Sequence, residues 1–342
     1  MANIRKVAQL AEVSVATVSR VLNHPERVSE KTKQKVISVM EEMDFSPNAL
    51  ARGLNLKRTN TIALIIPDIQ NPLYTEIARG VESIAHRNGN NLLLCNTEKD
   101  VEKEKSYVRM LIDKKIDGVI LAYTGLKDDD FREIIKKEIN LLLCGMNVAN
   151  KKISSVYSDF RTGAGLAVQH LIKVGYKRIA CITGSDRYIE NCEKVKGYIE
   201  TMTSAGLTVY PHYIIHGNDD INSGYLSALK LQKVDPRPEA LFVCNDLMAI
   251  GTINALQKTG VNVPGDIGVV GYDNIVMGSF IEPKLTTVSW PVYKMGIIAA
   301  RILLDEINTK TEDIHTQSIL LKPKLRIRQS CGHGDRVSEI FN

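Results

Sequence analysis

Short apolar runs alternate with longer amphipathic stretches from Thr61 almost to the end of this 342-residue chain. The first runs are TIALIIP, NLLLC, DGVILA and a second NLLLC, and strings such as YTEIARGVESIAHR and EKEKSYVRMLID separate them. Strands that alternate with helices of about 10–15 residues are typical of βαβ units, in which helices cover both faces of a parallel sheet. The pattern therefore predicts an α/β body built on a doubly wound parallel sheet.

A second series of apolar runs predicts a second subdomain of the same kind. It consists of KRIACITG, HYIIHG, EALFVCND and IGVVGYD. A late helix, PVYKMGIIAARILLDEIN, indicates that the chain crosses back to the first subdomain near Thr287–Trp290 before SILLKP and KLRIRQS finish the body. The resulting division is 60–158 with 289–317 for an N-terminal subdomain, 159–288 with 318–330 for a C-terminal subdomain, and 331–342 for a polar tail.

Residues 3–23 predict two short helices that meet at a tight turn. Apolar residues of the first helix recur at i, i+3, i+4 and i+7, so they share one face. They are Ile4, Val7, Ala8 and Ala11. Ser14 is placed to cap the second helix, and Val18, Val21 and Leu22 point inward. Short side chains at the first turn of the second helix suit close approach to the major groove, although any amphipathic hairpin has a similar pattern.

A third helix closes a small core over these two. Ser29 is placed as its N-cap, and its apolar face ends near Phe45. That face consists of Val36, Val39, Met40 and Met43. Ten basic and six acidic residues lie between Met1 and Asn60, so +4 of the formal net charge of +5 belongs to the first sixth of the chain. Residues 1–46 are therefore predicted to form a helix-turn-helix head that faces the phosphates of DNA.

Residues 47–59 predict a hinge helix. Leu50 and Leu54 lie four apart and share one face of two helical turns. A helix of this length is marginal in water, and Gly53 weakens it by about 1 kcal/mol. The alternative is a plain linker that ends in KRTN.

Composition narrows the class of protein. With 44% hydrophobic and 24% charged residues the chain is ordinary, and no apolar run approaches the roughly 18–20 residues that span a bilayer. No secretion signal opens the sequence, so we expect a cytoplasmic protein without membrane contact. The six cysteines form no Cys-x-x-Cys pair, which predicts reduced thiols and no metal site.

The sequence disfavours an enzyme. The first strand runs into PDIQNPLY, which has no glycine, and Gly163-Ala-Gly165 lacks the third glycine of a dinucleotide loop. We expect those two glycines to serve close helix packing. Neither a phosphate-binding G-x-x-x-x-G-K-[ST] loop nor a nucleophile G-x-S-x-G motif occurs. A sugar-transport protein would share the two-subdomain body, but it needs an export signal and has no use for a basic head.

Polar side chains come directly after several predicted strands, and ligands of open α/β sheets bind beyond these carboxyl ends. Asn71–Tyr74 follow IALIIP, Asn245-Asp246 follow ALFVC, and Asp273-Asn274 follow IGVVGY. Asp and Asn bind hydroxyl groups and aromatic rings cover a sugar face, so the set suits a polyhydroxylated ligand. Lys194 and Trp290 are candidates to join it. Alternatively, Asn245 and Asp273 are helix caps and turn formers.

Three motifs in register carry a family resemblance. The runs VAQLAEVSVATVSRVLN, RVSEKTKQKV and FSPNALARGL resemble the DNA-binding head of the lactose-repressor (LacI/GalR) family of bacterial transcription regulators. The resemblance extends from about Asn3 to Ser330. It implies a periplasmic-binding-protein-like body and a homodimer, or a higher oligomer, on a pseudo-palindromic operator in double-stranded DNA. It implies no cofactor, but a small-molecule effector between the subdomains.

By this resemblance, Val15, Ala16 and Arg20 read base edges. The positions that anchor phosphates are Ser14, Thr17, Ser19 and Asn23. The hinge contributes Asn48, Ala51 and Leu54, and Leu54 stands where a leucine wedges into the minor groove and kinks the duplex. Glu12 departs from the family, which often has glycine at this turn. In a left-handed conformation Glu12 would cost about 1–2 kcal/mol, and its charge is unhelpful near phosphates.

The effector residues implied by the resemblance are Leu73, Tyr74, Lys194, Asn245, Asp246, Asp273 and Trp290. Lys194 stands where many members have an arginine that grips the ligand. A lysine cannot make a bidentate fork, which leaves an anionic sugar or a protein corepressor open. Trp290 either stacks on a sugar or plugs the cleft. The expected function is a repressor of carbohydrate-catabolism genes controlled by a sugar or sugar acid, and the alternatives are a cytoplasmic carbohydrate-binding protein or a regulator activated by a corepressor.

Overall fold

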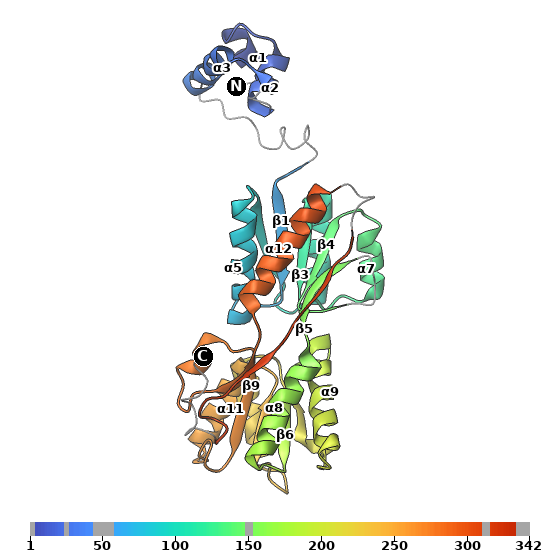
Figure 1. Cartoon of the computed structure of the whole chain (residues 1–342), viewed down its shortest axis with the longest axis vertical. Helices are drawn as coiled ribbons and strands as arrows, with labels where there is room; N and C mark the ends of the chain where they lie inside the picture. The colour runs from blue at the N-terminus through green and yellow to red at the C-terminus, as the bar shows by residue number, and fades with distance from the viewer. Residues whose placement is uncertain (1–3, 24–26, 44–57, 148–152, 310–314, 333–342) are drawn as a thin grey trace. The chain divides into compact units, whose positions relative to one another are not determined.

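A computed structural model describes residues 4–23, 27–43, 58–147, 153–309 and 315–332. The chain divides into two compact units, Met1–Thr59 and Asn60–Asn342, each of which has its own core (Figure 1). The hinge residues Asn48, Ala51 and Leu54 lie outside the described residues, as does Phe45.

The described residues of the first unit form three helices, α1 (Ile4–Leu10), α2 (Val15–Asn23) and α3 (Glu30–Glu42). They bury a small core, as the spacing of apolar residues predicts. Its fully buried members are Val7, Ala8, Ala11, Val18, Val21 and Val36. Serine side chains cap two of the helices, because Ser14 Oγ accepts from the Thr17 amide at 3.0 Å and Ser29 Oγ accepts from the Thr32 amide at 3.4 Å. Both predicted caps are therefore confirmed.

The second unit begins with an all-parallel sheet in the order β11-β5-β4-β3-β1-β2. Its strands are β1 (Thr61–Ile66), β2 (Asn91–Asn96), β3 (Gly118–Ala122), β4 (Asn140–Cys144), β5 (Ser154–Ser158) and β11 (Ser318–Leu321). The helices are α5 (Pro72–Arg87), α6 (Val101–Asp113), α7 (Asp128–Ile135) and α12 (Val292–Asn308). Residues of α5 and α12 pack on one face of the sheet and those of α6 and α7 on the other, so the sheet is doubly wound as predicted.

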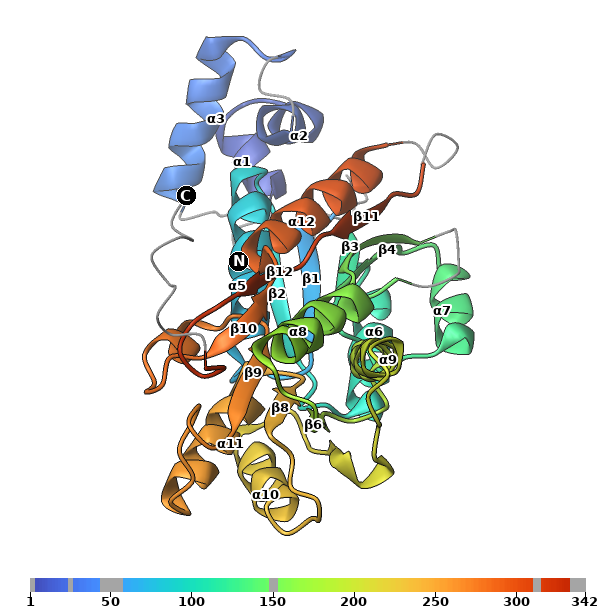
Figure 2. The same cartoon turned by 60° about the horizontal axis from the view of Figure 1, so that its bottom comes forward.

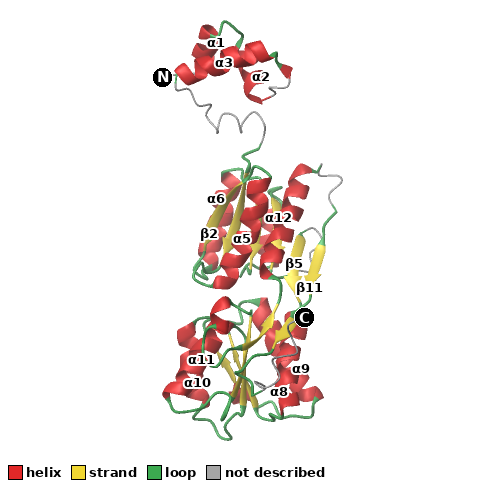
Figure 3. Cartoon of the chain, turned by 60° about the vertical axis from the view of Figure 1, so that its left-hand side comes forward, coloured by secondary structure: helices red, strands yellow, loops and turns green. Residues whose placement is uncertain are grey.

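A second sheet has the order β12-β10-β9-β8-β6-β7, and only β12 in it is antiparallel. Its strands are β6 (Ile179–Thr183), β7 (Ile214–His216), β8 (Ala240–Val243), β9 (Gly268–Tyr272), β10 (Thr286–Ser289) and β12 (Lys324–Arg326). The helices α8 (Phe160–Val174) and α9 (Ile189–Ser204) form one packed pair, and α10 (Ile221–Leu231) and α11 (Asp246–Lys258) form another. Figure 3 shows these pairs on opposite faces of the strands, and Figure 2 shows the second subdomain from below.

The predicted subdomain boundary at residue 318 is wrong. Strand β11 pairs with β5 of the first sheet, with Ser318 opposite Ser155 and Leu321 opposite Ser158. The chain therefore crosses between subdomains at 322–323, after β11 and before β12. The sequence misled because SILL and KLR are both short edge strands with alternating burial, and a period of two does not reveal which sheet a strand joins.

The C-terminal subdomain also extends past Ser330. Cys331, the first residue of the predicted polar tail, is fully buried and lies 3.2 Å from Nε2 of His170. The Gly163 of the predicted close-packing pair lies on α8 against Tyr272, whose hydroxyl would be 2.2 Å from an added Cβ. Helix α8 can approach β9 this closely because residue 163 has no side chain, which confirms the packing role expected for Gly163.

Candidate functional site

Helix α2 presents the residues expected to read DNA on its exposed face. Val15 is 42% exposed, and Ala16 and Arg20 are exposed beside it, whereas Val18 and Val21 face the core. Thr17 and Ser19 are half-buried, and Asn23 is the last residue of the helix. An α-helix with small side chains at its exposed start fits the major groove, which is about 12 Å wide.

The turn before α2 holds Glu12 in the left-handed region, with φ of 49°. The strain anticipated for a non-glycine residue is therefore present. A Lys35 ammonium from α3 lies 2.6 Å from Glu12 Oε2, and its hydrogen bond and charge lower the pKa of that carboxyl. Lys35 thus partly neutralises an acid that would otherwise face the phosphates.

In the second unit, aromatic rings from both subdomains meet in a cleft at the carboxyl ends of the strands. Tyr123 directly follows β3, and its ring centroid lies 5.4 Å from that of Tyr74 and 6.2 Å from those of Phe160 and Trp290. Phe160 in turn lies 6.4 Å from Tyr272. Of these five rings, sequence reasoning identified Tyr74 and Trp290 and missed the other three.

Lys194 occupies the C-terminal side of this cleft. It projects from α9, is only 4% exposed, and donates from Nζ to the Cys244 carbonyl at 2.9 Å. The same ammonium lies 4.3 Å from the ring centroid of Tyr272 and 5.5 Å from that of Phe160, within the range of cation–π attraction. The side chain predicted to grip a ligand is therefore engaged by the protein itself.

Acidic side chains of the C-terminal subdomain gather at the cleft. Asp273 lines one cavity with Leu73 of the N-terminal subdomain, Glu190 lies one turn before Lys194 on α9, and Asp219 is held by Asn191 and Asn245. Burial raises the pKa of the Tyr74 hydroxyl, and the charges of these three acids raise that pKa further. Burial also raises the pKa of Glu190 to about 8 and that of Asp273 to about 6. The sequence analysis identified Asp273 and missed Glu190 and Asp219.

The predicted pair Asn245-Asp246 divides into two different roles. Asn245 Oδ1 caps α11 by accepting from the Met248 amide at 2.8 Å, while its Nδ2 donates to Asp219 at 2.9 Å. Asp246 is fully buried and accepts from the Thr287 hydroxyl at 2.6 Å and from the Ile275 amide at 2.9 Å. Both Asp246 oxygens are thus used to hold the turn that carries Asp273, and Asp246 is a positioning residue.

A cavity of about 440 Å³ opens beside these groups. Leu73, Asp273 and Trp290 line it together with Glu76, Tyr293 and Arg328. Within the described part of the chain, Oη of Tyr123 and Oε2 of Glu190 are buried without a hydrogen-bond partner. Because buried polar atoms are normally paired, these two suit a ligand that carries donors and acceptors. The indole of Trp290 interacts with the Asp273 carboxylate and lowers its pKa, against the larger effect of burial.

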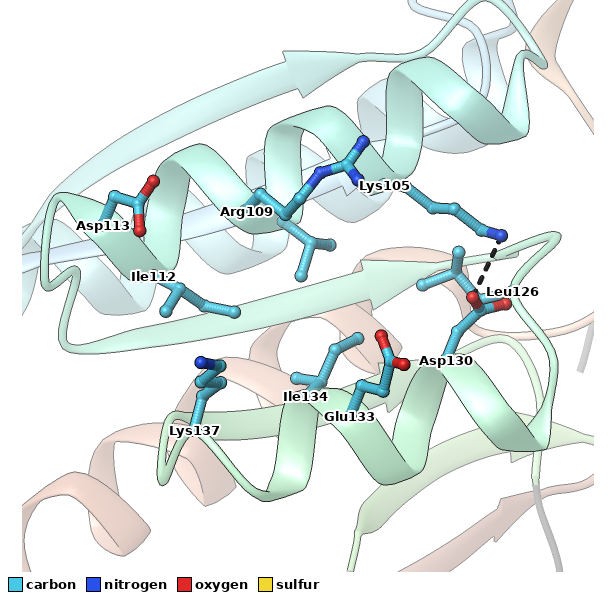
Figure 4. A pocket seen from close by; sticks show the side chains of 10 residues that line it. Lys105, Arg109, Ile112, Asp113, Leu126, Asp130, Glu133, Ile134 and Lys137 are labelled. Carbon is cyan, nitrogen blue, oxygen red and sulfur yellow. Dashed lines mark ion pairs between the residues drawn. The ribbon is translucent and has the colours of Figure 1, made fainter.

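A second cavity of about 360 Å³ lies between α6 and α7, on the far face of the first sheet from α5 (Figure 4). Lys105 and Asp130 form an ion pair of 3.0 Å at its edge. None of the predicted site residues lines this cavity.

Two further structural findings concern membranes and metals. Among the residues that the structure describes, none of the helices combines the length and apolarity needed to cross a lipid bilayer. The same residues contain no group of three or more His, Cys, Asp and Glu arranged to hold a metal ion.

The fold and the two sites define a class of protein that couples a helix-turn-helix head to a two-subdomain ligand-binding body. The head, residues 3–48, matches the model for bacterial regulatory proteins of the lacI family, and residues 168–331 match a periplasmic binding protein-like domain. Catabolite control protein A of Priestia megaterium is 37% identical over 96% of this chain and 98% of its own length. The chain belongs to the lacI family of bacterial regulatory proteins.

Other relatives agree with this assignment. The transcriptional repressor PurR of Aliivibrio salmonicida is 35% identical over 91% of this chain and 93% of its own length. The lac repressor dimer bound to operator and the anti-inducer ONPF superposes with a TM-score of 0.85 at 26% identity, over 96% of this chain and 99% of that one. A CelR–cellobiose complex has a TM-score of 0.73 at 28% identity, over 96% and 100% of the two chains.

The chain is accordingly a DNA-binding transcription regulator of this family. Its relatives are regulators and not enzymes, in line with the sequence prediction.

Proposed function

We propose that this regulator is a cytoplasmic repressor of carbohydrate-catabolism genes whose DNA binding is relieved by a sugar-class effector in the cleft. The observation that carries the proposal is the pair of buried, unpaired polar atoms on Tyr123 and Glu190 beside the cluster of aromatic rings that includes Trp290. Relatives in complex with cellobiose and with ribose support a carbohydrate ligand.

The head would bind one half of a pseudo-palindromic operator through α2. Val15, Ala16 and Arg20 lie on its exposed face, where they can reach base edges. Ser14, Thr17, Ser19 and Asn23 remain proposed phosphate contacts, and Asn48, Ala51 and Leu54 remain proposed hinge contacts. Two heads are needed, because a single module offers too few base contacts for specific binding.

In the body, direct ligand contacts are proposed for Leu73, Tyr74, Asn245, Asp273 and Trp290. We add Tyr123, which lies among the aromatic rings, and Glu190, which lies one turn before Lys194 on α9, because each has a buried polar atom without a hydrogen-bond partner. Asp246 would contribute indirectly, because it holds the turn that carries Asp273. Lys194 would also contribute indirectly, because its ammonium packs on the ring of Tyr272.

The ligand can act by preferring one arrangement of the two subdomains. One hydrogen bond joins the two subdomains across the cleft: Nζ of Lys99 in the N-terminal subdomain donates to the carbonyl of Asn218 in the C-terminal subdomain at 2.8 Å. A bound ligand could make or break this hydrogen bond. Arg187 also donates to the Lys99 carbonyl at 3.4 Å. An effector that alters this closure would alter the spacing of the two N-terminal subdomains in the dimer, and thereby the hinges.

An exposed apolar segment is a candidate part of the dimer interface. The short 3₁₀ helix Val276–Ser279 and the residue after it expose Val276, Met277 and Phe280, and Phe280 is 81% exposed. Large apolar side chains this exposed in one segment are typical of a surface that a partner covers. A second copy of the chain would bury them symmetrically around a two-fold axis.

Fluorescence anisotropy with labelled promoter DNA from the chain's own operon tests the proposal. We expect binding to one duplex at least about 1,000-fold tighter than to random DNA, and weaker binding when the effector is added. Arg301→Ala, an exposed arginine on α12, is a control that should bind the duplex normally. Equally weak, salt-sensitive binding to every duplex would contradict the proposal.

A further inference from the structure

The cleft holds more acidic than basic side chains. Glu190 lies one turn before Lys194 on the same face of α9, Asp219 accepts a hydrogen bond from Asn245, and Asp273 lines the cavity together with Trp290. Lys194 is the nearby ammonium, but its Nζ is directed to the Cys244 carbonyl and to the ring of Tyr272. In the described part of the chain, no carboxylate oxygen lies within 4 Å of this ammonium. An anionic ligand group would therefore meet three acidic side chains and an ammonium that is already engaged.

Both carboxylate oxygens of Asp219 have hydrogen-bond partners, whereas one oxygen of Glu190 has none. Asp219 accepts from Nδ2 of Asn245 at 2.9 Å, from the Ser185 amide at 3.3 Å and from Nδ2 of Asn191 at 3.4 Å. Glu190 is only 6% exposed, and its Oε2 has no hydrogen-bond partner. An unpaired buried carboxylate oxygen is costly, so Glu190 is the acid that would gain most from a new donor.

Aromatic faces surround the same space. Tyr123 stands at the centre of the ring cluster with Tyr74, Phe160 and Trp290, and its charge environment includes both Asp273 and Glu190. Aromatic faces attract cations, and the position of the Lys194 ammonium over the ring of Tyr272 is an example in this cleft. A carboxylate and electron-rich rings together favour a positively charged ligand group.

We propose that the effector carries a protonated primary amine beside its hydroxyl groups, as an amino sugar or an amino polyol does, and that Glu190 receives this amine. The inference rests on the proposed function, since it concerns the effector of the same cleft. It replaces the sugar acid that Lys194 suggests from the sequence alone. Hydroxyl groups of the same ligand would pair with Oη of Tyr123 and with Asp273, and its apolar face would lie against Trp290.

Isothermal titration of the full-length protein with a matched panel tests the amine. The panel contains 2-amino-2-deoxyhexoses and 1-amino-1-deoxyhexitols, their neutral parents, and the corresponding uronic acids and hexose phosphates. We expect an amine to bind about tenfold or more tightly than its neutral parent, and the anions to bind more weakly than either.

Substitutions at Glu190 locate the amine. Glu190→Gln should weaken binding of the amine about tenfold and change binding of the neutral parent less than about twofold. Glu190→Asp keeps the charge and should keep the preference for the amine. The control is Glu193→Gln on the same helix, because that carboxylate pairs with Arg161 at 3.0 Å and with Lys196 at 2.7 Å. This control should leave the ratio of the two affinities unchanged.

Three results would overturn the inference. They are a neutral or anionic compound that binds more tightly than every amine, a panel in which no amine binds, and a Glu190→Gln variant that keeps the full preference. If a neutral sugar binds and also weakens operator binding, the amine is wrong while the proposed function stands. If no compound alters operator binding and no duplex is preferred, the proposed function itself fails.

Discussion

The proposed DNA-binding head and the effector cleft differ in the exposure of their polar groups. On α2 the proposed base-reading side chains of Val15, Ala16 and Arg20 are exposed. The hydroxyls of Ser14 and Thr17 pair with each other at 2.9 Å. In the cleft the corresponding groups are buried, and several of them lack a partner. DNA can approach an exposed helix without any change in the protein. A ligand of the cleft, in contrast, has to pair with polar or charged groups that are already buried. Substitutions should therefore separate the two activities cleanly.

The largest effect is expected from Asp273→Ala. Its carboxylate lines the 440 Å³ cavity and sits on a left-handed turn, with φ of 109°, that Asp246 holds. The variant should lose response to the effector by about 100-fold or more in concentration, because a buried partner of ligand hydroxyls is removed. Operator affinity without effector should be retained, as anisotropy would show. A variant that still responds at the wild-type effector concentration removes Asp273 from the site.

Arg20→Ala should weaken operator binding and leave effector binding unchanged. Loss of a base contact is expected to weaken operator binding by about 1–3 kcal/mol and to relax specificity at the base pair concerned. Gel-shift titration measures the affinity, and calorimetry checks that effector binding is unchanged. Arg301→Ala serves again as the matched arginine control. If both variants bind the operator like wild type, α2 does not read it through Arg20.

The ionisation of Glu190 should make the stability of the folded protein depend on pH. The pKa of Glu190 in the folded protein is raised to about 8 by burial, so this group favours folding at low pH, and that contribution is lost as pH rises from about 4.5 to 8. Glu190→Gln removes the ionisation and should stabilise the ligand-free protein by several kcal/mol near pH 8.5 and hardly at all near pH 4.5, because a tenfold change in an ionisation constant corresponds to about 1.4 kcal/mol.

Denaturant unfolding at the two pH values measures this difference. The groups that face Glu190 in the cleft, Tyr74, Tyr123, Tyr188, Lys194, Asp219 and Asp273, stay unchanged in the variant. Glu193→Gln, at a half-buried acid with two cationic partners, should show no gain at the higher pH. Equal stabilisation by Glu190→Gln at both pH values would mean that folding does not raise the pKa of the Glu190 carboxyl.

The smallest effect is expected from Glu12→Gly in the head. Glycine relieves the left-handed conformation by about 1 kcal/mol, while the exposed pair with Lys35 contributes less than that. Removing an acid near the phosphates should also tighten operator binding about twofold. Anisotropy at low and moderate salt measures this gain, and weaker binding by the variant would show that the Glu12–Lys35 pair positions α2.

The sequence rules that worked were local ones. The helix periods and serine caps of the head depend on residues within a few positions of one another, and the structure confirms them. The residues directly after each predicted strand include Asp273 and Asn245, and the same rule applied to β3 and β7 would have found Tyr123 and the region of Asp219. Glu190 gave no such signal, because it sits in the first turn of α9 and an acid there is ordinary.

By itself the sequence determined the helix-turn-helix head, two parallel α/β subdomains and the family to which they belong, because periodicity and motif spacing are properties of neighbouring residues. Only the tertiary structure decided that β11 joins the first sheet, that Lys194 is engaged by its own protein and that three carboxylates share one cleft. These facts depend on distances between residues far apart in the chain, and burial then sets their charge, which no local pattern encodes.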